Sequence, residues 1–145
     1  MPSSSSDRHS IPRTIGRLLL AAFLLLAGVS HLTFSRIAFR AQVPEWLPVD
    51  PDFVVIASGV VEITLGLCLV LLTRRRVIVG IVVAVFFLLV FPGNISQLVT
   101  HTDSFGLDTD LARGIRLLFQ PLLVAWALWS TGAWKWIRRR HQARS

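Results

Sequence analysis

Long apolar runs separated by short polar segments dominate the pattern along this chain. Each of the four runs reaches or approaches the roughly 20 residues that a helix needs to cross about 30 Å of hydrocarbon. The runs cover residues 14–32, 53–73, 77–98 and 111–134. The pattern therefore predicts an all-α fold, a bundle of four transmembrane helices within a membrane domain of residues 14–136. Residues 1–13 are predicted to form a disordered tail, and residues 137–145 a basic tail.

The polar segments between the runs carry strong turn signals. Residues 35–52 contain Pro44, Pro48 and Pro51, whose spacing prevents a continuous helix. Trp46 in the same segment suits the level of the lipid headgroups. The run Arg74-Arg75-Arg76 forces a turn out of the membrane, so the second and third helices are expected to form a tight hairpin.

Composition and charge agree with this interpretation. Hydrophobic residues make up 53% of the 145 residues and the mean hydropathy is +0.63, too apolar for a soluble domain of this size. The basic residues flank the apolar runs and form no nucleic-acid-binding face, so no nucleic acid is expected as a partner. Eleven of the 15 basic residues lie on one side of the predicted bundle. The positive-inside rule then predicts a multi-pass protein of the inner or plasma membrane with both termini in the cytoplasm.

The sequence contains no self-sufficient catalytic motif. The single cysteine, Cys68, cannot form an internal disulfide or a Cys-x-x-Cys redox pair. No phosphate loop, nucleophile elbow or metal-spaced group of His and Cys is present. We therefore assign no catalytic or metal-binding residues.

Polar residues inside the apolar runs are the candidate functional residues, because burying a charge in hydrocarbon costs at least about 2.5–3.5 kcal/mol. Glu62 lies about 13 Å along the second predicted helix, among small residues that let another helix approach closely. Polar groups on the other three helices are expected at a similar depth in the outer half of the bundle. The predicted cluster consists of His31, Glu62, Asn94, Gln97, Arg116 and Gln120.

Two prolines, Pro92 and Pro121, fall within the third and fourth helices near this cluster. Each removes a backbone hydrogen bond and frees a carbonyl four residues earlier, at Leu88 and Leu117. Bends at these points are expected to open an outward-facing pocket. Two interpretations of the cluster stay open: Glu62 and Arg116 form a buried ion pair that sets helix register, or Glu62 belongs to a substrate or proton site.

The chain resembles the DoxX-like bacterial membrane proteins. Four short stretches carry the resemblance in the family's order, namely AGVSHL (27–32), VPEWLP (43–48), SGVVEITLG (58–66) and FPGNI (91–95). Leu32 and Gly93 replace a phenylalanine and an alanine of the family pattern. The resemblance implies a four-helix membrane protein, and some relatives are linked to thiosulfate:quinone oxidoreduction or to membrane oxidoreductase complexes. His31, Glu62 and Asn94 are polar members of those motifs.

These observations favour a membrane subunit of an oxidoreductase system, either non-catalytic or contacting quinone through Glu62, His31 and Arg116. Quinone is the candidate cofactor, membrane lipid the expected partner, and a redox protein and a second copy of the chain are further candidates. One alternative is a small-solute transporter or binding protein that uses Arg113 and Arg116. The other is a structural membrane scaffold in which the polar cluster serves only helix register.

Overall fold

A computed structural model describes residues 10–101, 103 and 109–144, and these residues form helices and connecting turns without a strand. The elements are α1 (Ile11–Leu32), α2 (Arg36–Arg40), α3 (Pro51–Leu71), the 3-10 helix η1 (Thr73–Arg75), α4 (Arg76–Val99), α5 (Asp110–Thr131) and α6 (Ala133–Gln142). Within the described residues four helical segments are long and apolar enough to cross a membrane: α1, α3, η1 with α4, and α5. The predicted fold class is confirmed.

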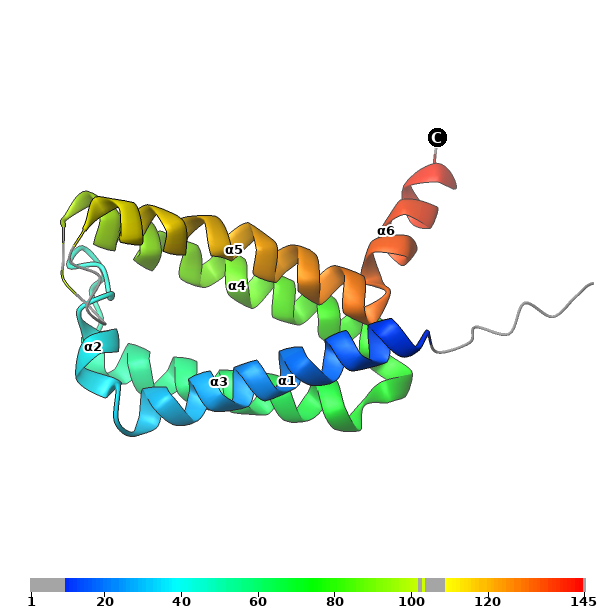
Figure 1. Ribbon diagram of the computed structural model, residues 1–145, viewed down its shortest axis with the longest axis horizontal. Coiled ribbons are helices and arrows are strands. Elements are labelled where there is room, and N and C mark those ends of the chain that lie inside the picture. The colour runs from blue at the N-terminus through cyan, green and yellow to red at the C-terminus, as the bar shows by residue number, and fades with distance from the viewer. Residues whose placement is uncertain (1–9, 102, 104–108, 145) are drawn as a thin grey trace, which may run out of the picture.

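The four long helices are arranged in two layers. α1 packs against α3 in one layer and α4 against α5 in the other, with α1 and α5 also in contact (Figure 1). The start of α1, the turn at η1 and helix α6 lie at one end of the bundle, here named the termini end (Figure 1). The opposite end, here named the loop end, carries α2 and the start of α5. Both ends of the described chain are therefore on the same side, whereas the side that faces the cytoplasm stays a prediction.

Local sequence signals explain where the helices begin at the loop end. The side chain of Asp50 accepts hydrogen bonds from the backbone N–H groups of Asp52 and Phe53, and Pro51 occupies the first turn of α3. Thr109 caps α5 in the same way through the N–H of Ala112. These caps satisfy N–H groups that the helices themselves cannot satisfy.

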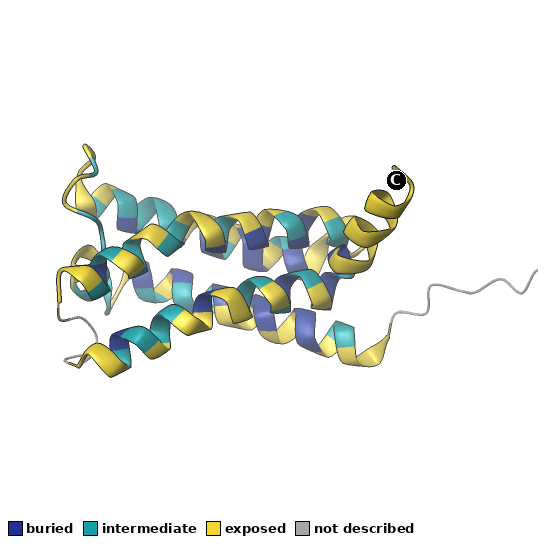
Figure 2. Cartoon of the chain, turned by 90° about the horizontal axis from the view of Figure 1, so that it is seen from above, coloured by how far each residue is buried: buried dark blue, intermediate teal, exposed yellow. Residues whose placement is uncertain are grey.

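Packing buries the inner helix faces and leaves the outer faces apolar. Dark buried positions line the inside of the bundle, and exposed positions run along its outside (Figure 2). Leu20, Leu24, Leu69 and Val83 are fully buried in the core. Large apolar side chains such as Leu26, Leu89 and Leu118 are instead exposed, each by about 70%. A soluble protein rarely exposes so large an apolar surface, and this one suits contact with lipid tails.

Glycines bring α1 and α3 into close contact. A Cβ built on Gly28 would lie 2.7 Å from the carbonyl oxygen of Gly59, and one built on Gly59 would lie 2.9 Å from the Cβ of His31. Real Cβ atoms do not tolerate such distances, so larger residues would push the two backbones apart. This close crossing places His31 opposite Glu62.

The helix boundaries differ from the predicted ones at several points. α1 begins at Ile11, within the predicted tail 1–13, and the first nine residues lie outside the described ones. The fourth long helix ends at Thr131, three residues before the predicted end, because Gly132 adopts a positive φ of 78°. The predicted basic tail 137–145 largely belongs to α6. The segment 35–52 contains the short helix α2 because its prolines begin only at Pro44.

Candidate functional site

The side chains of His31 and Glu62 are in direct contact between α1 and α3. The imidazole Nδ1 lies 2.7 Å from Oε2 of Glu62, and both residues are more than nine-tenths buried. Nδ1 also lies 2.9 Å from the carbonyl oxygen of Ala27. A carbonyl oxygen only accepts hydrogen bonds, so Nδ1 carries a hydrogen and donates it to Ala27.

The carboxylate of Glu62 is left with an unused acceptor. Oε2 is buried and has no hydrogen bond within the described part of the chain, since the N–H of His31 is directed at Ala27. Buried acceptors without a partner are rare and usually mark a bound molecule, a water or a reactive group. The pair therefore combines a partly satisfied carboxylate, an imidazole and an apolar surrounding.

Helix α2 covers this pair from the loop end. The ring of Phe39 stacks on the imidazole of His31, with centroids 3.4 Å apart and planes inclined by 22°. Arg36 anchors α2 to the first turn of α3 through two hydrogen bonds to Asp52, one of them 2.7 Å long from Nε to Oδ1. These hydrogen bonds raise the pKa of Arg36 above its usual value, against a smaller opposing effect of desolvation. The cover of the His31–Glu62 pair is thus held by a charged contact.

A second polar contact joins α4 and α5. Asn94 donates to Oε1 of Gln120 (2.9 Å), and Nε2 of Gln120 donates to the carbonyl oxygen of Phe87 (2.5 Å). The acceptor Phe87 directly precedes Leu88, whose carbonyl Pro92 frees. Both α4 and α5 remain continuous through their prolines. The side chain of Gln120 therefore satisfies a backbone carbonyl close to Pro92.

Arg116 contacts the segment between α2 and α3 rather than Glu62. Its Nη2 donates to Oε1 of Gln42 at 2.8 Å. The carbonyl oxygen of Gln42 lies close to α4, since a Cβ built on Gly93 would be 3.0 Å from it. The segment that begins with α2 thus contacts both layers, at His31 through Phe39 and at α4 and α5 through Gln42.

The nearby Arg113 is neutralised by carboxylates of the chain itself. Its Nη1 donates to Asp110 (2.8 Å), and its Nη2 donates to Asp103 and to the carbonyl oxygen of His101. The guanidinium is buried, while both acids are exposed at the loop end. Arg113 therefore ties the first turn of α5 to the residues that precede the helix.

The comparisons with known proteins place the chain in a family. Residues 20–131 match the model of a domain of unknown function, DUF8561. The chain belongs to the DUF8561 family. Neither a curated protein nor a solved structure matches the chain.

The matched DUF8561 region contains all six predicted site residues, which the structure brings together in part. His31 contacts Glu62, and Asn94 contacts Gln120. Gln97 is buried on α4, and Arg116 is half-buried on α5. The partner of Glu62 is His31 and not Arg116, because the close α1–α3 crossing brings the imidazole to the carboxylate. No group of three or more His, Cys, Asp or Glu side chains that could hold a metal ion occurs among the described residues.

One buried charge of the chain lies just before the DUF8561 match. Arg17 lies within α1 and is only 5% exposed. Its Nη1 donates to the carbonyl oxygen of Leu69 at 2.5 Å, in the last turn of α3. Cations near helix C-termini offset the unsatisfied carbonyls there. The sequence does contain a signal for this burial: Arg17 lies on the same helix face as Leu20 and Leu24, which are core residues.

Proposed function

We propose that this DUF8561 protein is a membrane subunit of an oxidoreductase system and that it contacts a quinone headgroup at His31 and Glu62. The observation that carries the proposal is the unused Oε2 of Glu62, buried 2.7 Å from an imidazole in a helix expected to cross the membrane. An intramembrane carboxylate is costly, and function is the usual reason that one is retained.

The pair suits the proton chemistry of a quinone. Reducing a quinone to a quinol takes two electrons and two protons. The electrons would come from a partner dehydrogenase, because the chain has one cysteine and no recognisable redox motif. A protonated Glu62 would donate a hydrogen bond to a quinone carbonyl and pass one of the two protons to it as the ring is reduced. Water would supply the second proton and then reprotonate the carboxylate, beside the imidazole of His31.

Two further features support this assignment. The stacked rings of His31 and Phe39 provide a flat, largely apolar surface of the kind that binds a quinone ring. The resemblance to DoxX-like proteins, some of which are linked to quinone oxidoreduction, points to the same chemistry and stays a prediction. The inner or plasma membrane, where quinones are found, remains the proposed location.

A structural scaffold is the second candidate, since most of the polar cluster is satisfied internally. Asn94, Gln120 and Arg116 all donate to groups of the chain itself. The transporter alternative is weaker, because Arg113 is already paired with two carboxylates and Arg116 with Gln42. The quinone and scaffold proposals thus differ at Glu62, which contacts a ligand in the first and only other parts of the chain in the second.

The deciding experiment is mass spectrometry of the lipids and proteins that co-purify in mild detergent. The variant Glu62→Gln keeps the side-chain volume and removes the carboxylate, and Glu45→Gln makes the same change at an exposed loop position. We expect quinone or a redox protein to be enriched with the wild type and with Glu45→Gln, and lost from Glu62→Gln. If all three preparations carry the same bulk lipid and no partner, the quinone proposal is wrong and the scaffold is favoured.

A further inference from the structure

Helix α6 turns away from the bundle at a single glycine. α5 ends at Thr131, and Gly132 adopts a left-handed φ of 78°, which changes the direction of the chain. Figure 1 shows α6 leaving the end of α5 and running across the long axis of the bundle. Within α6, which the structure describes completely, Ala133 is buried and residues 134–142 are exposed (Figure 2). Nearly all of α6 is therefore available to the surroundings of the protein.

The exposed part of α6 has an apolar face and a basic face. Trp134 and Ile137 lie one turn apart on one face, and they are 48% and 39% exposed. Lys135 and Arg139 lie one turn apart on the other side of the helix, and both are exposed. A helix with tryptophan and isoleucine on one face and basic residues on the other is typical of helices that lie in a membrane interface.

Trp136 lies at the border between the two faces and carries a cation on its ring. The guanidinium carbon of Arg140 is 4.2 Å from the centroid of the Trp136 ring. The contact combines an apolar ring with a positive charge, and tryptophan is enriched at the level where acyl chains meet headgroups. Trp136 therefore suits the same level of a membrane as the two faces of α6.

The charge of the segment after Gly132 is strongly positive. No acidic residue follows Asp110 in the sequence, whereas five basic residues follow Gly132, namely Lys135, Arg138, Arg139, Arg140 and Arg144. One acidic residue, Asp7, precedes α1, and it lies outside the described residues. A single carboxylate does not balance five positive charges. The charge of this segment is therefore complementary to an anionic surface.

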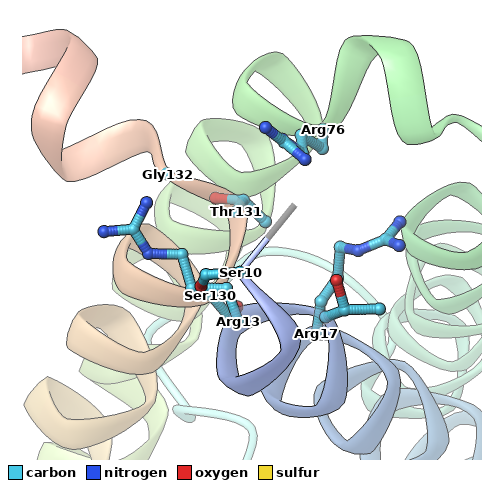
Figure 3. Close-up of a pocket in the computed structure, with 8 residues that line it drawn as sticks. Ser10, Arg13, Arg17, Arg76, Ser130, Thr131 and Gly132 are labelled. Carbon is cyan, nitrogen blue, oxygen red and sulfur yellow. The ribbon is translucent and has the colours of Figure 1, made fainter. Parts of the chain in front are cut away.

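Other arginines extend the positive charge across the termini end. Arg74 and Arg75 are exposed in η1. A cavity of about 30 Å³ lies beside Gly132, between the starts of α1 and α4 and the end of α5 (Figure 3). Its lining includes Arg13, Arg17 and Arg76 and the hydroxyl groups of Ser130 and Thr131. α6 thus begins at an end of the bundle that is rich in basic groups.

We infer that α6 lies in the headgroup layer of an anionic lipid membrane. α5 is long and apolar enough to cross a membrane, so its end at Thr131 places the start of α6 at the level of the headgroups. Because α6 runs across the bundle axis, it follows the membrane plane. Trp134 and Ile137 enter the boundary of the acyl chains, and the basic face contacts the lipid phosphates.

The test measures the depth of the two faces of α6 in the full-length protein. The protein is placed in nanodiscs made of phosphatidylcholine alone or of an equal mixture with phosphatidylglycerol. A nitroxide spin label is attached at Ile137→Cys on the apolar face or at Gln142→Cys on the opposite face, in a Cys68→Ala background. Electron paramagnetic resonance then measures collisions of the label with oxygen, which is enriched in the bilayer, and with a nickel chelate, which stays in water.

In the anionic nanodiscs we expect the ratio of oxygen to nickel collisions to be at least about threefold higher at Ile137→Cys than at Gln142→Cys. The ratio at Ile137→Cys should fall at least about twofold in Arg138→Gln/Arg139→Gln, or when phosphatidylglycerol is left out. The matched control Arg74→Gln/Arg75→Gln removes two exposed charges from η1 and should leave the ratio unchanged.

Three results would overturn the inference. The first is an equal ratio at the two labelled positions in the anionic nanodiscs. The second is an equal fall of the ratio at Ile137→Cys in the two double variants. The third is a low rate of collision with both reagents at Ile137→Cys, because it would show that a second copy or another protein covers this face.

Folding of the variants is checked by circular dichroism and gel filtration. If Arg138→Gln/Arg139→Gln does not fold, the comparison of the two lipid compositions carries the test, and a ratio at Ile137→Cys that does not depend on phosphatidylglycerol overturns the inference. α6 and the His31–Glu62 pair lie toward opposite ends of the bundle (Figure 1). The outcome is therefore independent of the quinone proposal.

Discussion

The two ends of the bundle differ in how the chain balances its charges. At the loop end α3 and α5 begin with side-chain caps and acidic first turns, and Arg36 and Arg113 are paired with carboxylates. At the termini end α1, α4 and α6 have neither a side-chain cap nor an acid in the first turn. Among the described residues, the loop end therefore contains both signs of charge, whereas the helix starts at the termini end carry no acidic residue.

This difference distinguishes polar groups that stabilise the fold from polar groups that are available to a ligand. Groups at the loop end are mostly satisfied internally, so the unused oxygen of Glu62 stands out as a position for a ligand. Arg13 and Arg17 at the termini end line one cavity, and neither is paired with an acid among the described residues. The two ends thus differ in character: a buried carboxylate beside an imidazole lies toward the loop end, and a cavity lined by arginines and hydroxyl groups lies at the termini end.

The largest effect is expected from separating α1 and α3. Gly59→Val places side-chain atoms against the backbone of Gly28 and the Cβ of His31, and it separates His31 from Glu62. We expect a loss of about 3 kcal/mol in the free energy of unfolding, at the upper end of the usual cost of overpacking. Unfolding by SDS in mixed micelles, followed by circular dichroism, measures it.

A glycine on another helix provides the control for Gly59→Val. Gly114 on α5 has open space around the position of a Cβ, so Gly114→Ala should leave stability unchanged or raise it by up to about 1 kcal/mol. Equal losses in the free energy of unfolding from Gly59→Val and Gly114→Ala would show that the close approach of α1 and α3 does not contribute to stability.

The His31–Glu62 pair is expected to have the next largest effect. A double-mutant cycle with His31→Gln and Glu62→Gln should give a coupling energy of about 1–2 kcal/mol, because the two side chains are in direct contact and buried. The same unfolding assay measures it. Additive losses, with a coupling near zero, would mean that the 2.7 Å contact contributes nothing to stability.

The Asn94–Gln120 contact should contribute less than the His31–Glu62 contact. Hydrogen bonds between transmembrane helices contribute about 0.6 kcal/mol on average, so Asn94→Leu should cost roughly that amount. Gln120→Leu should cost more, since it also leaves the carbonyl of Phe87 without its side-chain donor. A smaller loss for Gln120→Leu than for Asn94→Leu would contradict this order of importance.

The sequence contains enough information for the fold and only part of the site. Four runs of the length needed to cross a membrane determine the bundle, and the burial of Glu62 follows from the cost of exposing a carboxylate to lipid. Its partner does not follow, because the contact between His31 and Glu62 depends on the offset of α1 against α3 set by Gly28 and Gly59. Periodicity assigns residues to a face and leaves that offset undetermined.

At the termini end the sequence indicates the buried face for Arg17 but not what its side chain contacts, and it does not indicate the cavity. Arg17 resembles a flanking topology charge until packing shows its guanidinium at the last turn of α3. The cavity combines residues of α1 and α5 that are more than a hundred positions apart with Arg76 of α4. Charge patterns report the side of the membrane, and only the packing of helix ends shows which arginines meet.

The smallest effect is the most specific test of the comparison between the two ends. In uncharged detergent at low salt, Arg76→Gln should stabilise the protein by on the order of 0.5 kcal/mol, because it removes a repulsion of Arg17. Asp52→Asn should destabilise it slightly, because Arg36 loses its carboxylate. The same unfolding assay measures both variants. If Arg76→Gln instead destabilises the protein, repulsion of Arg17 is not the main effect of Arg76, and the charge difference between the two ends reflects membrane orientation alone.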